Sequence, residues 1–240
     1  MIAAFSRNFV FIRTRKTAST STEIVLGSWC DELDIVTPVG VEDELMRLDY
    51  GGSPRNFCLD SSLEAEYRTT IQTRDAKAIA VIYRRVMEKL DFHHHMGASE
   101  LISRLPADFW DRAFKFSVDR HPYDKVVSLA YWRGRKLIEK GASINDLLDE
   151  VVEKGEYRNF DLYSVDGSVV VDRVFRYENL WSELSALAEQ VGGAIPARPP
   201  KAKSRYRRDR QPAGNLLSQQ QKHRVYDICR EEFALLGYER

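Results

Sequence analysis

The sequence predicts an α/β domain in three layers, with a central, mostly parallel sheet flanked by helices. Two observations lead to this fold class. Short apolar segments of strand length alternate along the chain with longer segments that have helical periodicity. At residues 9–22, and again at residues 112–128, an apolar strand runs into a helix through a short connection. Strands followed directly by helices are the building unit of parallel sheets.

The first half of the chain alternates in this way, apart from one loop-rich stretch. Gly51-Gly52-Ser53-Pro54 marks that stretch as irregular, and Ser61-Ser62-Leu63-Glu64 after it has the form of a helix capping box. The expected elements are a strand over residues 8–14, a helix over 20–30, an irregular segment over 31–60, helices from 61 to about 90 with a break near Thr73, a short strand over 91–95 and a helix over 98–105.

The second half contains the clearest helix start and stop signals. Pro122 suits the first position of a helix, and Gly192-Gly193 suits the residues that end one. The expected elements are a strand over residues 113–118, helices over 123–140 and 143–153, a hairpin turning at Asp166-Gly167 with its second limb over 168–177, a helix over 179–191, a basic loop over 198–214 and a final helix opened by Ser218 to Gln221.

Length and composition fit a single domain over residues 1–240. The 240 residues are 43% hydrophobic and 30% charged, as in globular proteins. Lys plus Arg and Asp plus Glu number 36 each, so the chain has no overall charge that would favour nucleic acid or a membrane surface. The charge is segregated, however, because residues 198–210 (RPPKAKSRYRRDR) are strongly basic.

Neither a membrane span nor a targeting segment is predicted. No apolar run reaches the roughly 18 residues that a bilayer-spanning helix needs, and the amino terminus lacks the pattern of a secretory signal. Cys30, Cys58 and Cys229 match neither a disulfide framework nor a zinc-binding pattern. We therefore expect reduced thiols and a cytoplasmic protein. The oligomeric state is left open.

The segment FVFIRTRKTASTST, residues 9–22, has the layout of a buried strand, a tight loop and a helix start. The first N–H groups of a helix have no partner within it and attract anions. Lys16 adds a positive charge at this point, and hydroxyl groups follow at Thr17, Ser19, Thr20, Ser21 and Thr22. The segment lacks the glycines of a Walker A motif. It predicts a phosphate-like ligand, although a simple Ser/Thr-capped helix has the same pattern.

The second segment, RAFKFSVDRHPYDKVVS, repeats this layout at residues 112–128. Arg120 falls on the turn between the strand and the helix, and Ser128 lies two turns into that helix. An arginine offers a planar pair of donors that suits a phosphate, and a serine adds a short neutral donor. The alternative is that Arg120 pairs with a helix end while Ser128 packs without a ligand.

The two segments, in this order, resemble the nucleotide-binding motifs of sulfotransferases that use PAPS (3′-phosphoadenosine-5′-phosphosulfate), in particular those that act on carbohydrates. In that family the Lys-containing loop holds the 5′-phosphosulfate, and the Arg and Ser of R-x-P-x5-S hold the 3′-phosphate. The resemblance implies a fold like that of the P-loop NTPases. It assigns cofactor binding to Arg15, Lys16, Thr17, Ser19, Thr20, Ser21, Thr22, Arg120 and Ser128, together with Lys203 and Arg205 of the basic loop.

The resemblance also implies in-line displacement of the sulfuryl group by an acceptor hydroxyl. Lys16 is then placed to neutralise the charge that builds on the bridging oxygen, so it counts as a catalytic residue. No metal is required, because the cations are side chains. The product of the donor is PAP, 3′-phosphoadenosine 5′-phosphate. The expected partner is a hydroxyl-bearing acceptor on a glycan or glycolipid, toward which the basic loop could also contribute charge.

Three consecutive histidines, His93 to His95, lie between the two motifs. In the carbohydrate-type branch a His in this region acts as general base, and His95 is the closest match. If residues 91–95 form a strand, His93 shares a face with His95 while His94 points the other way. The histidines could instead pack or hold a metal with ligands from elsewhere. Glu100 is an alternative base.

Two other functions fit the same motifs. A nucleotide-dependent phosphotransferase would need a metal and an Asp at the end of a neighbouring strand, where Asp119 stands. A non-catalytic adenine-nucleotide-binding module would bind PAP without transferring anything. Residues 31–60 match no part of the resemblance, and the basic loop could bind either nucleotide or acceptor.

Overall fold

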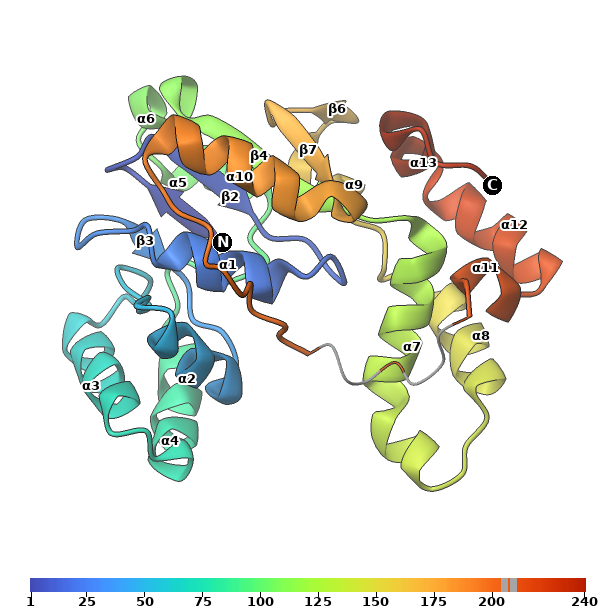
Figure 1. The fold of residues 1–240 in the computed structure, drawn as a ribbon, viewed down its shortest axis with the longest axis horizontal. Helices are drawn as coiled ribbons and strands as arrows, with labels where there is room; N and C mark the ends of the chain where they lie inside the picture. The colour runs from blue at the N-terminus through green and yellow to red at the C-terminus, as the bar shows by residue number, and fades with distance from the viewer. Residues whose placement is uncertain (204–206, 208–210) are drawn as a thin grey trace.

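The computed structural model describes residues 1–203, 207 and 211–240 and has an α/β architecture (Figure 1). Its centre is a mixed sheet of five strands. In spatial order these are β3 (Ile35–Val36), β1 (Ile2–Ala4), β2 (Phe9–Ile12), β4 (Phe114–Asp119) and β7 (Arg173–Arg176). A separate small hairpin pairs β5 (Ser164–Val165) with β6 (Ser168–Val169), as the Asp166-Gly167 turn predicts.

The prediction of a mostly parallel sheet is wrong. β4 runs parallel to both β2 and β7, but β1 is antiparallel to β2 and to β3. The cause is a tight turn between β1 and β2, in which Asn8 takes a left-handed backbone with φ of 57°. Asn tolerates that conformation better than most residues. Residues ahead of the first expected strand therefore fold back to pair with it.

The helices agree closely with the expected ones, with additions. Asp60 and Asp75 accept N–H groups at the starts of α3 and α4, so the predicted break near Thr73 is real and each helix has its own cap. The predicted capping box at Ser61 to Glu64 is wrong, because Asp60 rather than Ser61 is the N-cap. The helices are α1 (Ser19–Gly27), α2 (Val41–Asp49), α3 (Ser61–Gln72), α4 (Ala76–Met87), α5 (Ala98–Arg104), α6 (Ala107–Arg112), α7 (Pro122–Glu139), α8 (Ile144–Lys154), α9 (Phe160–Tyr163), the 3-10 turn Tyr177–Asn179, α10 (Leu180–Val191), α11 (Ala213–Leu216), α12 (Gln219–Ile228) and α13 (Arg230–Leu236).

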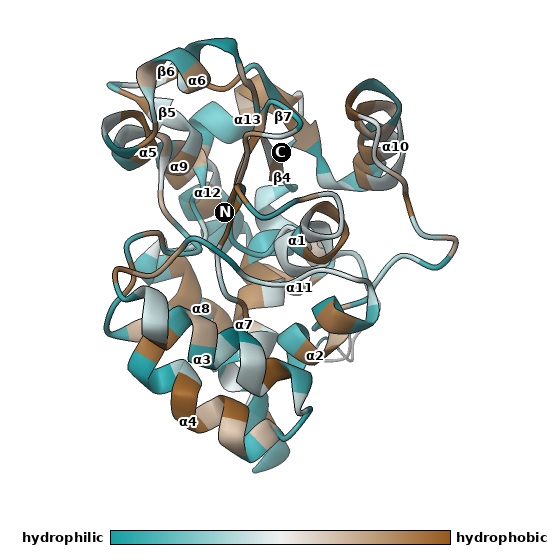
Figure 2. Ribbon diagram, turned by 90° about the vertical axis from the view of Figure 1, so that its left-hand side faces the viewer, coloured by the Kyte–Doolittle hydropathy of each residue, from teal (hydrophilic) through white to brown (hydrophobic). Residues whose placement is uncertain are grey.

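Helices cover both faces of the sheet. Side chains alternate along β2, so Phe9 and Phe11 pack on one face with α1 and α10, while Val10 and Ile12 pack on the other with α3 to α6. A third apolar cluster joins α7, α8, α11, α12 and α13 into a helical lobe beside the sheet (Figure 1). The outer helices α3 and α4 carry both hydrophilic and hydrophobic positions in Figure 2, as expected for helices with one buried face.

Three expected segments differ from the structure. The second hairpin limb, expected over 168–177, is divided into β6 and β7, which belong to different sheets. Residues 31–60 are not irregular throughout, since they contain β3 and α2. Residues 91–95 are not a strand. The backbone N–H groups of Asp91 and Phe92 both donate to the carbonyl of Phe57, which bends the chain there. Among the described residues, no helix is both long and apolar enough to cross a membrane.

Candidate functional site

The two predicted anion-binding segments leave the sheet side by side. β2 and β4 are parallel neighbours, with Ile12 paired to Ser117, so the loop after β2 and the turn after β4 emerge at the same edge. In open α/β sheets this carboxyl edge is where ligands bind. Lys16, Arg120 and Ser128 all line one cleft of about 1360 Å³. The residues of the two predicted segments thus line one shared cleft rather than separate ones.

The loop between β2 and α1, residues 13–18, exposes backbone donors to this cleft. Lys16 and Ala18 have φ of 63° and 57°, on either side of Thr17, whose φ is not positive. Alternation of this kind turns successive N–H groups toward one point and creates an anion-binding concavity. Ala18 stands at the N-cap of α1 and has no side-chain oxygen to cap the helix. The first N–H groups of α1 are therefore available to a ligand.

The hydroxyl groups of this region do not all serve the cleft. Thr14 donates its proton to the Val118 carbonyl, so the contact between Thr14 and Thr17 (2.8 Å) must use the proton of Thr17. Thr22, a predicted binding residue, donates to the Ala18 carbonyl and lies outside the cleft lining. Thr20 accepts from Arg13 (2.9 Å) and keeps its own proton for a ligand.

Ser19 and Ser21 also line the cleft. The Ser21 hydroxyl oxygen accepts the N–H of Ala202 at 3.1 Å, so the segment after α10 crosses the helix start. In that segment Lys203 lines the cleft and pairs with Asp43 of α2 at 2.9 Å. The stretch 31–60, for which the sequence suggests no role, thus holds part of the basic loop in place. The predicted binding residue Arg205 lies outside the described residues.

Lys16 occupies a strongly cationic environment. Its ammonium lies 5.1 Å from the centroid of the Trp132 ring. Burial, followed by four neighbouring positive charges, lowers the Lys16 pKa to about 7. Those charges belong to Lys203, Arg120, Arg133 and Arg135. No negative charge of the described residues is among the causes. Positive charges that lower the pKa of a lysine in this way define a site that an anion would stabilise.

Arg120 is held in place by an aromatic ring and a carboxylate. Its guanidinium lies 4.2 Å from the centroid of the Tyr177 ring, and one terminal nitrogen donates to Asp124 at 3.2 Å. Its Nε is buried without a hydrogen-bond partner among the described residues. Arg207 donates to the same Asp124 oxygen at 2.9 Å. Arg120 therefore keeps donor capacity facing a cleft in which a phosphate could take the place of the shared carboxylate.

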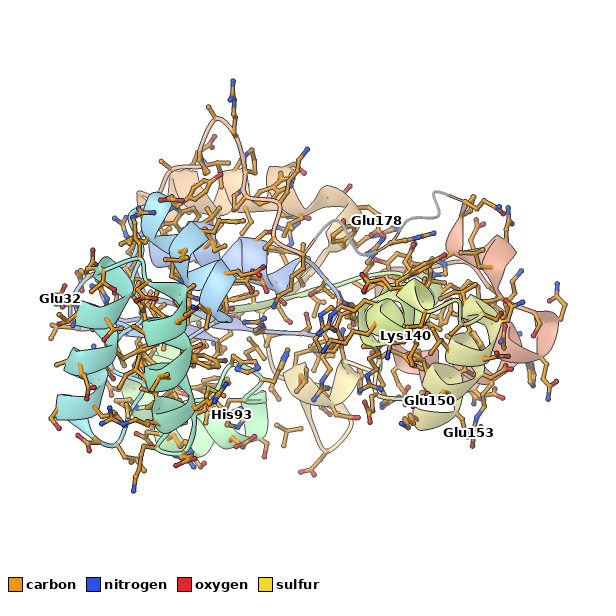
Figure 3. The ribbon with its side chains drawn as sticks, turned by 90° about the horizontal axis from the view of Figure 1, so that it is seen from below. Glu32, His93, Lys140, Glu150, Glu153 and Glu178 are labelled. Carbon is orange, nitrogen blue, oxygen red and sulfur yellow. The ribbon has the colours of Figure 1, made fainter. Side chains whose placement is uncertain are left out.

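The histidine run separates into different environments. His93 is 42% exposed, pairs with Glu100 at 3.3 Å and does not line the cleft, and Glu100 does not line it either. In Figure 3 His93 lies among the helices beside the sheet, away from Lys140 and Glu150 on the helical lobe. The expectation that His93 shares a catalytic face with His95 is wrong, because residues 91–95 are not a strand. Glu100 is also placed wrongly for a base.

His95 lines the cleft and has a defined tautomer. Its Nδ1 lies 3.3 Å from the carbonyl oxygen of Arg13, which can only accept, so Nδ1 carries the proton and Nε2 has a free lone pair. Burial and then the Arg13 charge lower the His95 pKa to about 2, so the ring is neutral at physiological pH. His94 also lines the cleft, with a pKa lowered to about 3, mainly by burial.

Asp119 is the residue that a phosphotransferase would need to bind its metal, but its carboxylate is used in hydrogen bonds within the protein interior. It is fully buried, and its carboxylate accepts from Lys125 (2.8 Å), Asn159 (2.9 Å) and the Tyr163 hydroxyl (2.9 Å). It does not line the cleft. In the described part of the chain, no three His, Cys, Asp or Glu side chains are grouped as metal ligands.

Several cleft residues could not be identified from the sequence. Trp132 and Arg133 come from the exposed side of α7, where an aromatic and a charge fit any surface helix. Arg133 contacts Glu156. The predicted binding residue Arg15 lies in the same cleft, and its pKa is lowered by burial and by the positive charge of Arg133. Asn159 reaches the loop from a distant helix. These residues become neighbours through long-range packing, for which the sequence carries no local signal.

The comparisons with known proteins do not identify a relative. A scan against models of protein families finds no match, and searches of curated proteins and of solved structures find no similar protein. A functional assignment therefore rests on the contacts described above.

Proposed function

We propose that this protein is a PAPS-dependent sulfotransferase with a fold like that of the P-loop NTPases, and that it transfers a sulfuryl group to a hydroxyl group of a carbohydrate. One observation carries the proposal. Lys16, which we assign to one anion, and Arg120 with Ser128, which we assign to a second, line one cleft at the carboxyl edge of the sheet. A nucleotide with phosphates at both its 5′ and 3′ positions requires two such pockets.

The roles follow from the geometry. N–H groups of residues 16–19 and the free protons of Thr20 and Ser21 would hold the 5′-phosphosulfate oxygens. Lys16 would stabilise the charge that develops on the bridging oxygen as sulfur leaves the adenosine phosphate. Arg120 and Ser128 would hold the 3′-phosphate. No residue in this scheme depends on a metal ion.

His95 is the best-placed base among the described residues. Its unprotonated Nε2 can accept the proton of the attacking hydroxyl. A pKa of about 2 makes the free imidazole a weak base. The positive charges of Arg13 and Arg15 help to lower the His95 pKa. A bound donor brings negative charge next to these two arginines, and should therefore raise the His95 pKa toward physiological pH. Proton transfer is then coupled to donor binding.

The burial and hydrogen bonding of Asp119 disfavour the phosphotransferase alternative. The non-catalytic module shares the same nucleotide pockets, so activity alone separates it from the enzyme. The test is to incubate the protein with PAPS and a panel of neutral and acidic oligosaccharides, and to follow PAP formation and sulfated product by mass spectrometry. PAP formation that depends on an acceptor supports transfer. Tight PAP binding without transfer to any acceptor would favour the module.

The low pKa of Lys16 predicts that nucleotide binding takes up protons. A bound phosphosulfate or phosphate should raise this pKa, so binding at pH 8 should take up about one proton per site. Below pH 7 Lys16 is already charged, and affinity should be highest. Above pH 7 the free protein loses that proton, and affinity should fall. Calorimetry with PAP at pH 8, in buffers of different ionisation enthalpy, measures the uptake, and Lys16→Met should abolish it.

The structure also predicts opposite results for two neighbouring histidines. His95→Ala should lower kcat by about 10²- to 10⁴-fold, the usual effect of losing a general base. It should change PAP affinity little, because the imidazole faces the acceptor hydroxyl in this scheme. His93→Ala is the matched control and should leave kcat unchanged, since His93 lies outside the cleft. Equal losses in both variants would contradict the role of His95.

A further inference from the structure

Asn159 stands at the N-cap of α9 but does not cap it. At this position an Asn side chain normally accepts N–H groups of its own helix. Here the Asn159 side chain makes no such bond, and Glu232 of α13 accepts the N–H of Asn159 itself and that of Phe160 (2.9 Å), the first helical residue. Both Asn159 and Glu232 are fully buried. The Asn159 amide group is therefore released from its helix and free to bind other elements.

The released amide joins the two anion-binding segments. Its Oδ1 accepts the N–H of Arg15 at 2.9 Å, and its Nδ2 donates to the Arg15 carbonyl at 3.0 Å. The same Nδ2 donates to Asp119 at 2.9 Å. Arg15 directly precedes Lys16, and the Asp119 carboxylate also accepts the N–H of Arg120 at 2.8 Å. One side chain thus fixes the backbone beside Lys16 relative to the turn that carries Arg120.

A buried ion-pair network fixes Asn159 in turn. Lys125 of α7 donates to Asp119 at 2.8 Å and to Glu232 at 2.5 Å, and all three side chains are inaccessible to solvent. Buried charges that are paired and hydrogen-bonded hold defined positions, because moving one leaves the others without partners. The network links β4, α7 and α13 to the residue that holds the loop.

We propose that Asn159 is a positioning residue that sets the separation and orientation of the two anion pockets, so that a single nucleotide is held by both at once. The identity of the ligand in this inference rests on the proposed function. The claim that Asn159 holds the 13–18 loop in place does not depend on that function. Without the Asn159 amide, the Arg15 backbone loses both partners and the loop can move. A displacement of about 1 Å at a reacting group can cost on the order of 100-fold in rate.

The test compares Asn159→Ala with Tyr163→Phe. The control removes one hydrogen bond from the same Asp119 carboxylate and leaves the 13–18 loop untouched. We expect both variants to lose thermal stability. Asn159→Ala should in addition weaken PAP binding about tenfold and lower kcat about 100-fold, whereas Tyr163→Phe should keep PAP affinity within about threefold. Should Asn159→Ala fail to fold, Asn159→Ser, whose hydroxyl is too short to reach both partners, replaces it.

Hydrogen exchange separates failure of this inference from failure of the proposed function. The Arg15 amide should exchange faster in Asn159→Ala than in Tyr163→Phe, whatever the ligand is. Wild-type protein that does not bind PAP would refute the nucleotide assignment, and the exchange rates would still decide the role of Asn159. Unchanged Arg15 exchange, or PAP affinities that fall equally in both variants, would overturn the positioning role.

Discussion

Lys16→Met should lower kcat for sulfuryl transfer by about 10²- to 10³-fold, the effect of removing one preorganised group that stabilises developing charge. The reason is the position of this ammonium, which lies in the half-buried loop between β2 and α1 and close to four other positive charges. A charge in such surroundings acts more strongly than one in bulk water. The effect should fall mainly on kcat, because charge on the bridging oxygen builds in the transition state.

The matched control is Lys140→Met, which removes an exposed lysine at the end of α7, outside the cleft. It should leave kcat and KM unchanged. Rates are measured as PAP formation at saturating PAPS. A Lys16→Met enzyme that keeps its kcat and shows only a raised KM would contradict a role in the transition state and reduce Lys16 to a binding residue.

Arg120→Ala should remove the preference for the 3′-phosphate. Hydrogen bonds to a charged group contribute about 1.5–3 kcal/mol each, so PAP affinity should fall about 10- to 150-fold. AMP, which lacks the 3′-phosphate, should bind the variant and the wild type within about threefold of each other. Isothermal titration of both nucleotides into both proteins provides the comparison.

The control for this substitution is Arg173→Ala. Arg173 is 58% exposed, pairs with Glu183 and does not line the cleft, so its removal should affect neither nucleotide. An Arg120→Ala protein in which PAP and AMP affinities fall by the same factor would place Arg120 away from the 3′-phosphate. Its interaction with Asp124 would then be structural.

The features that could be predicted from the sequence are those that depend on local residue patterns. Residues 9–22 and 112–128 each contain a strand, a turn and a helix start in direct succession, so their layout follows from apolar runs, Pro122 and the small residues of the loop. Their approach in space follows as well, because parallel neighbouring strands end at one edge. The capping box at Ser218 with Gln221 is confirmed for the same local reason.

What could not be predicted depends on partners far away in the chain. The strand Ile2–Ala4 pairs backward because of a turn at Asn8 that has no glycine signal. The chain bends just ahead of the histidine run because Asp91 and Phe92 donate to the carbonyl of Phe57. A local pattern of alternating residues cannot reveal that distant contact. Asn159 has no motif of its own. Its proposed positioning role depends on distant residues such as Glu232, 73 residues later, which accepts the backbone N–H of Asn159.

The ion pairs around the cleft explain how so many positive charges can be gathered there in the folded protein. Arg120 and Arg207 share the Asp124 carboxylate, and Arg133 contacts Glu156, so part of the positive charge is balanced within the protein. Burial and neighbouring positive charges lower the pKa of Lys16 to about 7. Much of the positive charge in the cleft is therefore already held in place by ion pairs in the unliganded protein. Repulsion between the cations acts on Lys16, the residue that we propose stabilises the transition state.

Calorimetric titration of the wild-type protein can show whether one cleft holds both ends of a nucleotide that is phosphorylated at its 3′ and 5′ positions. PAP, ATP and AMP should be titrated separately in the same buffer near pH 7 and without added metal. We expect one site per chain, with PAP the tightest ligand, ahead of ATP and AMP. Tighter binding of ATP than of PAP, or equal binding of PAP and AMP, would contradict this expectation.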